Sequence, residues 1–294
     1  MTLFRVSGSI SRCLEILAVI LLAAIATAGA DPVLDMADSL MGAGFYDDAV
    51  TEYRRFLFFN ESPKKRSPVY SRLGYCYAYL GDRDAAVDAL SRAIDFAEND
   101  SLALQYRIDR AVVFAATNDI VRAGIELEEI IAGADSRALK KRAGMLLFMV
   151  RVLQHDWPTA RIIYDRFLRN ESYHSDSIKR FLDRAVNDRY KSPGKAMLLS
   201  TIFPGAGQIY NGHWLSGLNA LALNLALGYL TVDLVSDREY VPVFLSYIFL
   251  FQRYYSGNRG SAYQQAVAHN RQQDLQYENE ILSLLKQIVT PKAK

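Results

Sequence analysis

Cysteine is almost absent from this chain, since only Cys13 and Cys76 occur among its 294 residues. Two widely separated cysteines exclude a disulfide framework and a cysteine-based zinc site. The chain also lacks an excess of one charge, because 34 Lys and Arg are balanced by 32 Asp and Glu mixed along the sequence. This balance argues against a nucleic-acid partner. Cys76 is expected to be a small, buried, apolar side chain.

Sequence motifs for catalysis are missing as well. The chain contains no nucleophile elbow, no phosphate-binding loop and no dinucleotide-binding glycine pattern. Its histidines lie far apart, without carboxylates at a spacing that suggests metal or triad chemistry: His155, His174, His213 and His269. We therefore expect a non-enzymatic protein without a metal or cofactor.

What the chain does have is 51% hydrophobic residues, enough for a sizeable core and about two domains. Its first thirty residues begin with Arg5 and Arg12, continue with an aliphatic run at 16–24, and end with small residues. This order is typical of a secretory signal peptide and predicts cleavage after Ala30. An uncleaved anchor is the alternative, although the run is short for a bilayer span and Glu15 lies at its edge.

An internal repeat of 37 residues follows. The stretch YRRFL at 53–57 returns as YDRFL at 164–168, an offset of 111 residues, which is three times 37. Steps of 37 connect four alanines, each inside a helical pattern: Ala49, Ala86, Ala123 and Ala160. Four units of this length extend over residues 31–170, and such a period is the signature of a repeat architecture.

The second unit, YSRLGYCYAYLGDRDAAVDALSRAI, resembles a tetratricopeptide repeat. Its marker positions are Tyr70, Leu73, Gly74, Tyr77, Gly81, Ala86, Leu90 and Ala93. The aromatic and leucine positions form one face of a first helix, and Gly81 permits the turn to a second helix. Asn118 and His155 stand where glycine is usual in the third and fourth units. Asn tolerates a left-handed turn, whereas His155 departs from the pattern.

The resemblance implies an all-α stack of helix pairs with a groove that binds a protein or peptide partner. Groove residues are expected mainly on the first helix of each unit: Arg72, Tyr75, Tyr79, Arg107 and Arg110. The alternative is a stack that serves only as a spacer.

The composition changes after the polar stretch at 170–177, from which a further helix is expected to run to about Arg189. Residues 214–235 form an apolar run of 22 residues without a charge before Asp233, long enough for a bilayer core. A second, shorter run covers residues 240–251 and is marginal as a span. One face of the first run carries Gly217, Ala220, Asn224 and Gly228, a stripe that permits close helix contact and self-association.

Between two apolar segments lies PGAGQIYNG, at residues 204–212. Pro204 and Gly205 are expected to end one segment, and Gly207 and Gly212 to allow positive φ. Gln208, Tyr210 and Asn211 are expected to satisfy backbone groups at the corner. The alternative is a direct contact of these polar residues with lipid or a partner.

These residues also carry a second resemblance. SPGKAMLLSTIFPGAGQIYNGHWLSG and the later YYSGNRGSAYQQAVAHN resemble a C-terminal membrane domain of bacterial envelope proteins that has the motif P-G-x-G-Q-x-Y-x-G before an apolar hairpin. The likeness covers about residues 191–270 and implies membrane association without catalysis. With the signal peptide it predicts a bacterial envelope protein with its repeats in the periplasm and lipid contact over residues 196–255.

We thus predict an all-α protein of five segments: a signal peptide at 1–30, four repeats at 31–170, a linker helix at 171–192, a membrane-associated hairpin at 193–257, and a polar helix with a tail at 258–294. The expected function is a membrane-tethered scaffold or adaptor. An accessory factor for membrane-protein insertion or envelope assembly is the alternative.

The distribution of basic residues conflicts with the predicted export of the repeats. Arg189, Lys191 and Lys195 precede the hairpin, Arg253 and Arg259 follow it, and the positive-inside tendency places such flanks in the cytoplasm. Three explanations stay open: residues 196–209 cross or re-enter the membrane, the apolar runs pack without spanning, or the charge bias is overridden.

Overall fold

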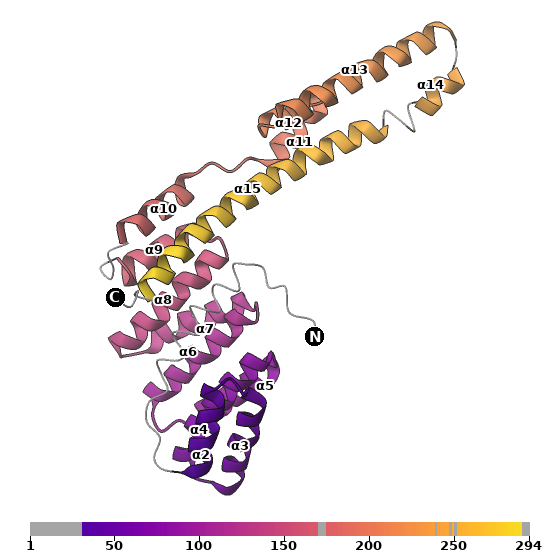
Figure 1. Ribbon diagram of the computed structural model, residues 1–294. Helices are drawn as coiled ribbons and strands as arrows, with labels where there is room; N and C mark the ends of the chain where they lie inside the picture. Colours follow the sequence, from indigo (N-terminus) through magenta and orange to yellow (C-terminus); the bar gives the residue numbers. More distant parts are fainter. Residues whose placement is uncertain (1–30, 170–174, 239, 247–248, 250–251, 290–294) are drawn as a thin grey trace. The chain divides into compact units, whose positions relative to one another are not determined.

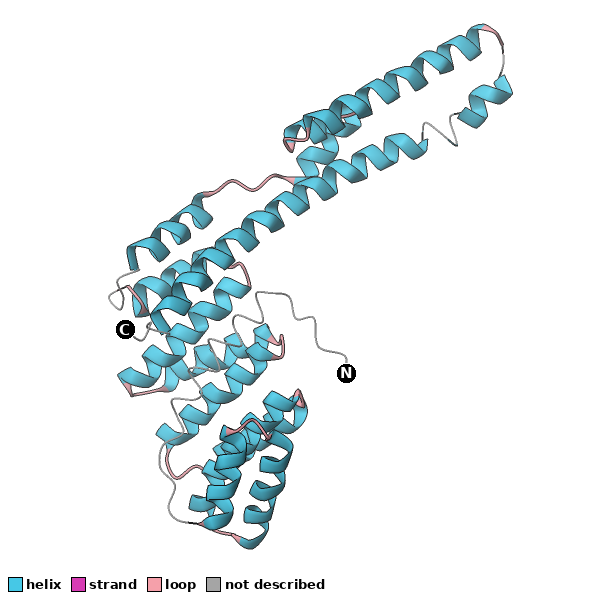
Figure 2. Cartoon of the chain, in the orientation of Figure 1, coloured by secondary structure: helices cyan, strands magenta, loops and turns pink. Residues whose placement is uncertain are grey.

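The computed structural model describes residues 31–169, 175–238, 240–246, 249 and 252–289. Within these residues every regular element is a helix (Figure 2). The all-α prediction is therefore confirmed for the described part of the chain. The expected signal peptide and part of the polar stretch at 170–177 lie outside the described residues.

The chain divides into two compact units. The first unit comprises residues 1–186 and 277–294, and the second comprises residues 187–276. The last helix starts in the second unit and ends in the first, so the expected segment at 258–294 is shared between them.

Helix hairpins build the first unit (Figure 1). From α2 to α9, each helix packs against the next along the chain. The bounds are α2 Pro32–Gly42, α3 Tyr46–Phe59, α4 Pro63–Leu80, α5 Arg83–Asp95, α6 Asp100–Ala116, α7 Ile120–Gly133, α8 Arg137–Leu153, α9 Trp157–Phe167 and α10 Ser175–Asn187. Capping side chains start several of them by accepting a backbone N–H: Asp82, Asn99, Asp119, Ser136 and Asp156.

Four left-handed residues form the turns within these hairpins. Gly81 and Asn118 have φ of 80° and 64°, as the pattern predicted, and Gly44 has φ of 84°. His155 also adopts the left-handed conformation, with φ of 55°. The missing glycine therefore does not abolish the fourth turn. The His155 Nε2 atom lies 2.8 Å from the Glu278 carboxylate, which anchors the ring.

The alanines spaced by 37 residues lie on the second helices α3, α5, α7 and α9 and are all fully buried: Ala49, Ala86, Ala123 and Ala160. Small side chains at these positions let neighbouring helices approach closely. The 37-residue repeat of the sequence therefore corresponds to a helix contact that recurs in the core once per unit.

The far end of this core includes two segments from outside the repeats. Helix α10, expected as a linker, buries Ile178, Leu182 and Ala185 in the same cluster as α8 and α9. The final part of α15 buries Ile281, Leu282 and Leu285 there as well. The end of the polar C-terminal helix therefore packs on the repeats.

The second unit contains a short helical pair followed by a long apolar helix. Its elements are α11 Pro193–Ile202, α12 Ala206–Tyr210, α13 Trp214–Ser236, α14 Tyr240–Ser246 and the first part of α15 Gln252–Val289. The bend expected at 204–212 thus contains a helical turn, and α15 starts at Gln252, before the expected residue 258. Among the described helices, α13 is the one long and apolar enough to cross a membrane. Its large apolar side chains are mostly exposed, and its buried residues are Gly217 and Asn224.

Candidate functional sites on the repeat face and at the glycine-rich junction

Ion pairs connect the first helices of successive hairpins. Arg72 of α4 approaches the Asp38 carboxylate of α2 at 3.3 Å, and the Tyr53 hydroxyl donates to the same carboxylate at 2.6 Å. Arg142 of α8 donates to Asp109 of α6 at 3.0 Å. Arg72 is therefore held between helices, so that any partner would meet a charge already paired with a carboxylate.

Tyr75 does not lie on an accessible groove, contrary to expectation. Its side chain is buried, and burial together with the neighbouring Asp109 carboxylate raises the pKa of its phenol. Burial also raises the pKa of Asp109, against the opposing effect of Arg142. The Asp109 carboxylate that interacts with the Tyr75 phenol belongs to α6, the first helix of the next hairpin.

The two predicted arginines of α6 are paired with carboxylates of α7. Arg107 contacts Glu126 at 3.1 Å and Glu129 at 2.6 Å, whereas Arg110 contacts Glu126 at 2.6 Å. Arg110 also donates to the Ser91 hydroxyl at 2.9 Å. About a quarter of each arginine side chain stays exposed. Both arginines hold α6 against α7 and present only part of their charge to solvent.

Tyr79 is the predicted groove residue that remains most available. It is 45% exposed and its ring stacks on Tyr46 with centroids 4.6 Å apart. Phe45 and Leu80, the chain neighbours of these rings, are also exposed. We call Phe45, Tyr46, Tyr79 and Leu80 the aromatic patch. Exposed, mutually braced aromatic rings are typical anchors of protein interfaces.

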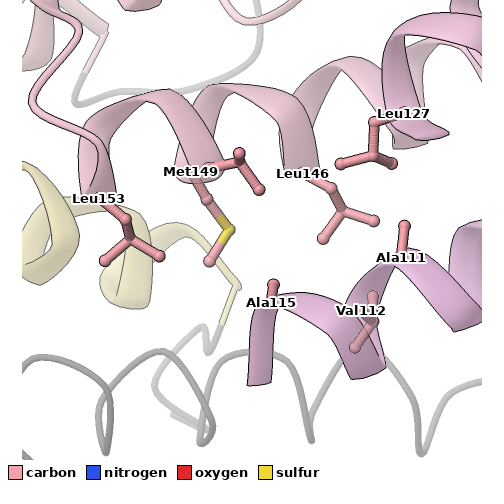
Figure 3. Close-up of a pocket in the computed structure, with 8 residues that line it drawn as sticks. Ala111, Val112, Ala115, Leu127, Leu146, Met149 and Leu153 are labelled. Atoms are coloured by element: carbon pink, nitrogen blue, oxygen red, sulfur yellow. The ribbon is translucent and has the colours of Figure 1, made fainter. Parts of the chain in front are cut away.

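A small apolar cavity lies between α6, α7 and α8 (Figure 3). Leu146, Met149 and Leu153 of α8 point toward it from one side and Ala111, Val112 and Ala115 of α6 from the other. Its volume of about 20 Å³ is close to that of a single water probe, and its lining is apolar. It is therefore a packing space and not a ligand pocket.

A larger open pocket, of about 360 Å³, lies between the start of α8 and the end of α9. Phe167 forms part of its wall and packs directly on Gly144, where a methyl group would clash with the ring. Asp165 is the acidic side chain of the lining. The basic lining residues are Arg137, Lys140, Lys141, Arg166 and Arg169. The surplus of positive charge suits an acidic segment of a partner, and the run RALKKR was its signal in the sequence.

Glycines of the second unit allow close approach of three helices. Gly205, before α12, has φ of 95°, and a methyl group on it would overlap the backbone of Gly217 in α13. Gly207 faces the backbone carbonyl of Ala196 in α11, where a methyl group would also overlap. Gly212 has the expected positive φ, at 91°, but Gly207 does not. Gly207 is thus required for close packing and not for its backbone conformation.

Gln208 is the polar centre of this junction and is only 2% exposed. Its Oε1 accepts from the Ser200 hydroxyl at 3.0 Å, and its Nε2 donates to the Asn258 backbone carbonyl at 2.9 Å and to the Asn258 side-chain oxygen. Ser200 in turn accepts the Gly207 backbone N–H at 3.0 Å. Gln208 therefore connects α11, α12 and α15.

Asparagines extend the junction along α15. Asn211 donates to the Ala262 carbonyl at 2.7 Å, and Asn270 makes two 2.8 Å hydrogen bonds with the Lys191 backbone. Asn258, Ala262, Ala266 and Asn270 recur every fourth residue and so share one face of α15. Sequence reasoning missed this face, although the spacing of four was its signal.

No protein-family model matches this chain, and no curated protein sequence shows significant similarity to it. Among the described residues, no group of three or more His, Cys, Asp or Glu side chains is placed to hold a metal ion. The two resemblances noted in the sequence thus stay predictions.

Proposed function

We propose that this protein is a non-enzymatic, membrane-tethered scaffold of the bacterial envelope, which binds a protein partner through tetratricopeptide-like repeats. The observation that carries the proposal is the exposure of α13. This helix of 23 residues is predominantly apolar, and side chains such as Leu215, Leu225 and Val232 are about two thirds exposed. So large an apolar surface is typical of a membrane or interface segment.

The first unit supports the scaffold part of the proposal. Its buried 37-residue period and left-handed turns agree with a stack of helix pairs, an architecture that exposes long side surfaces to partners. The aromatic patch supplies apolar anchors, and the basic pocket at α8 and α9 supplies charge for an acidic segment. Both surfaces favour a protein partner over a small-molecule substrate.

Membrane tethering is tested by washing membranes that carry the full-length protein with high salt and then at alkaline pH. The parent should remain with the lipid fraction. Leu225→Asp should weaken retention, because a carboxylate at the centre of a spanning helix costs about 2.5–3.5 kcal/mol. Ile162→Asp is the matched control, since Ile162 is equally exposed but lies on α9 of the first unit. Release of the parent by either wash would contradict the tether.

Partner binding is tested with a photo-crosslinking amino acid at Tyr79 and, as a control, at Ile162. A discrete adduct at Tyr79 alone supports the scaffold. Adducts at neither position would favour a stack that acts only as a spacer. Depletion followed by proteomics of the envelope separates the alternative function: a scaffold should affect one complex, whereas an accessory assembly factor should lower several unrelated membrane proteins.

A further inference from the structure

The two ends of the α11–α12 pair are held together. The Lys191 ammonium donates to the Tyr210 backbone carbonyl at 3.1 Å, and the Ser192 backbone N–H donates to the Tyr210 hydroxyl at 3.1 Å. The chain therefore leaves residue 191, passes through both helices, and is back beside its starting point at residue 210.

Contacts with α15 show how far the α11–α12 pair extends from its base. Asn270 bonds the Lys191 backbone at the base, and the Tyr255 hydroxyl donates to the Thr201 carbonyl at 2.6 Å near the bend. These two positions on α15 are 15 residues apart, a rise of about 22 Å. Helix α11 itself has 10 residues and spans about 15 Å, half of a bilayer core of about 30 Å. The pair is thus too short to cross.

The outer surface of the pair is apolar. Ala196 and Ser200 face inward and are buried, whereas the remaining large side chains of α11 and the bend are exposed: Met197, Leu198, Leu199, Ile202 and Phe203. Gly205 lies against Gly217 of α13, and the start of α13 also exposes large apolar side chains: Trp214, Leu215 and Leu218.

At the bend, many backbone N–H and C=O groups are hydrogen-bonded within the protein. Pro204 has no N–H group, the Ala206 N–H donates to the Phe203 carbonyl at 2.9 Å, and the Ile209 N–H donates to the Gly205 carbonyl at 3.1 Å. Ser200 and Tyr255 satisfy two further groups, as described above. Irregular backbone is tolerated at membrane depth only where its polar groups are paired or line a cavity.

We infer that α11 and α12 form a re-entrant helical pair, which inserts its apolar bend into lipid from one face of the membrane and returns to that face. The inference rests on the proposed membrane association. Helix α13 is then the first segment that crosses, and Lys191, Lys195 and His213 lie on one side. Lys195, in the first turn of α11, is exposed at the base of the pair, where a cation can reach the headgroups.

The test uses the full-length chain with Cys13→Ser and Cys76→Ser, reconstituted in vesicles of phosphatidylethanolamine and phosphatidylglycerol. Single cysteines replace Lys195, His213 and Ser236, which are all exposed. A membrane-impermeant maleimide should label the same fraction of the molecules at 195 and 213. It should label the complementary fraction at 236, whatever the mixture of orientations.

A second readout locates the bend. A fluorophore on Ile202→Cys should be quenched by spin-labelled lipid and not by aqueous iodide, as should one on Leu225→Cys in α13. One on Ile162→Cys should respond to iodide only. Complementary labelling at 195 and 213 would overturn the inference in favour of a crossing. Iodide quenching at 202 would overturn it in favour of a surface location, and protection from both quenchers would indicate cover by a second copy. Iodide quenching at 225 would instead refute membrane association itself.

Discussion

Replacing Gln208 with alanine is the sharpest test of the junction, because this one side chain touches two other helices. The substitution removes one hydrogen bond accepted from Ser200 and two donated to Asn258. It also leaves the Ser200 hydroxyl and the Asn258 oxygens without these partners in a buried place.

The expected magnitude follows from counting these bonds. A hydrogen bond between membrane helices contributes about 0.6 kcal/mol on average, and one in a soluble protein about 1 kcal/mol. Three bonds therefore give a loss of about 2–3 kcal/mol in the free energy of unfolding of the second unit. A glutamine on a solvent-exposed turn would change that free energy by less than about 0.5 kcal/mol.

The assay is denaturant unfolding in detergent micelles, followed by the fluorescence of Trp214, which opens α13 beside the junction. A parallel titration of Trp214→Phe supplies the signal of the second tryptophan for subtraction. Gln264→Ala is the matched control, since Gln264 is an exposed glutamine of α15 in the same unit. Gln208→Met keeps most of the volume and loses the bonds.

The reasoning predicts large losses for both Gln208 variants and almost none for Gln264→Ala. If Gln208→Met were as stable as the parent, volume and not hydrogen bonding would explain the burial of this residue. If Gln208→Ala were also within about 0.5 kcal/mol of the parent, the junction would not hold the helices together.

Three further predictions concern other parts of the chain. Gly207→Ala should lower the free energy of unfolding by at least about 2 kcal/mol, because the added methyl group overlaps the backbone of α11. In Gly228→Ala the methyl group meets nothing within 4 Å, so this variant should be neutral or stabilising. Equal effects of the two substitutions on unfolding in detergent would contradict the packing argument. Burial raises the pKa of Asp109, so folding favours its protonated form and its contribution to stability is lost as pH rises above the ordinary value of 3.8. The stability of Asp109→Asn relative to the parent should therefore increase from pH 4 to pH 7 in urea unfolding, and a constant difference would refute this assignment. Burial raises the pKa of the Cys76 thiol to about 12, so a maleimide should label Cys76 at pH 7 only after unfolding, and rapid labelling of the folded chain would contradict its location.

The repeat and its turns were predictable because their signals are local. The alanines every 37 residues report helix contacts that recur with each unit, and glycine or asparagine at a turn reports a left-handed backbone whatever the distant surroundings are. The burial of Cys76 was also predicted correctly, because an isolated cysteine behaves as a small apolar side chain. His155 shows the limit of such signals, because its left-handed turn accompanies a contact with Glu278, 123 residues away.

The predicted groove was less accurate. Tyr75 and Tyr79 both lie on α4, yet one is buried against a carboxylate from α6 and the other is exposed on a second ring. Arg107 and Arg110 were predicted as groove residues, and the structure pairs both with Glu126. A helical pattern tells which residues share a face, but it does not tell what the neighbouring helix places opposite them.

By itself the sequence determined the helical class, the repeat period, the position of the long apolar helix and the left-handed backbone at Gly212. These properties depend on side chains within a few residues of one another, through helical periodicity, chain stiffness and the length of an apolar run. Only the tertiary structure decided that Gln208 is a buried link to α15, that Gly207 is required for close packing, and that residues 191 and 210 lie together. Those outcomes depend on atoms of other helices or segments, 11 residues away for Gly207, 19 for the contact of residues 191 and 210, and 50 for Gln208. The approach of these segments is set by the packing of whole helices.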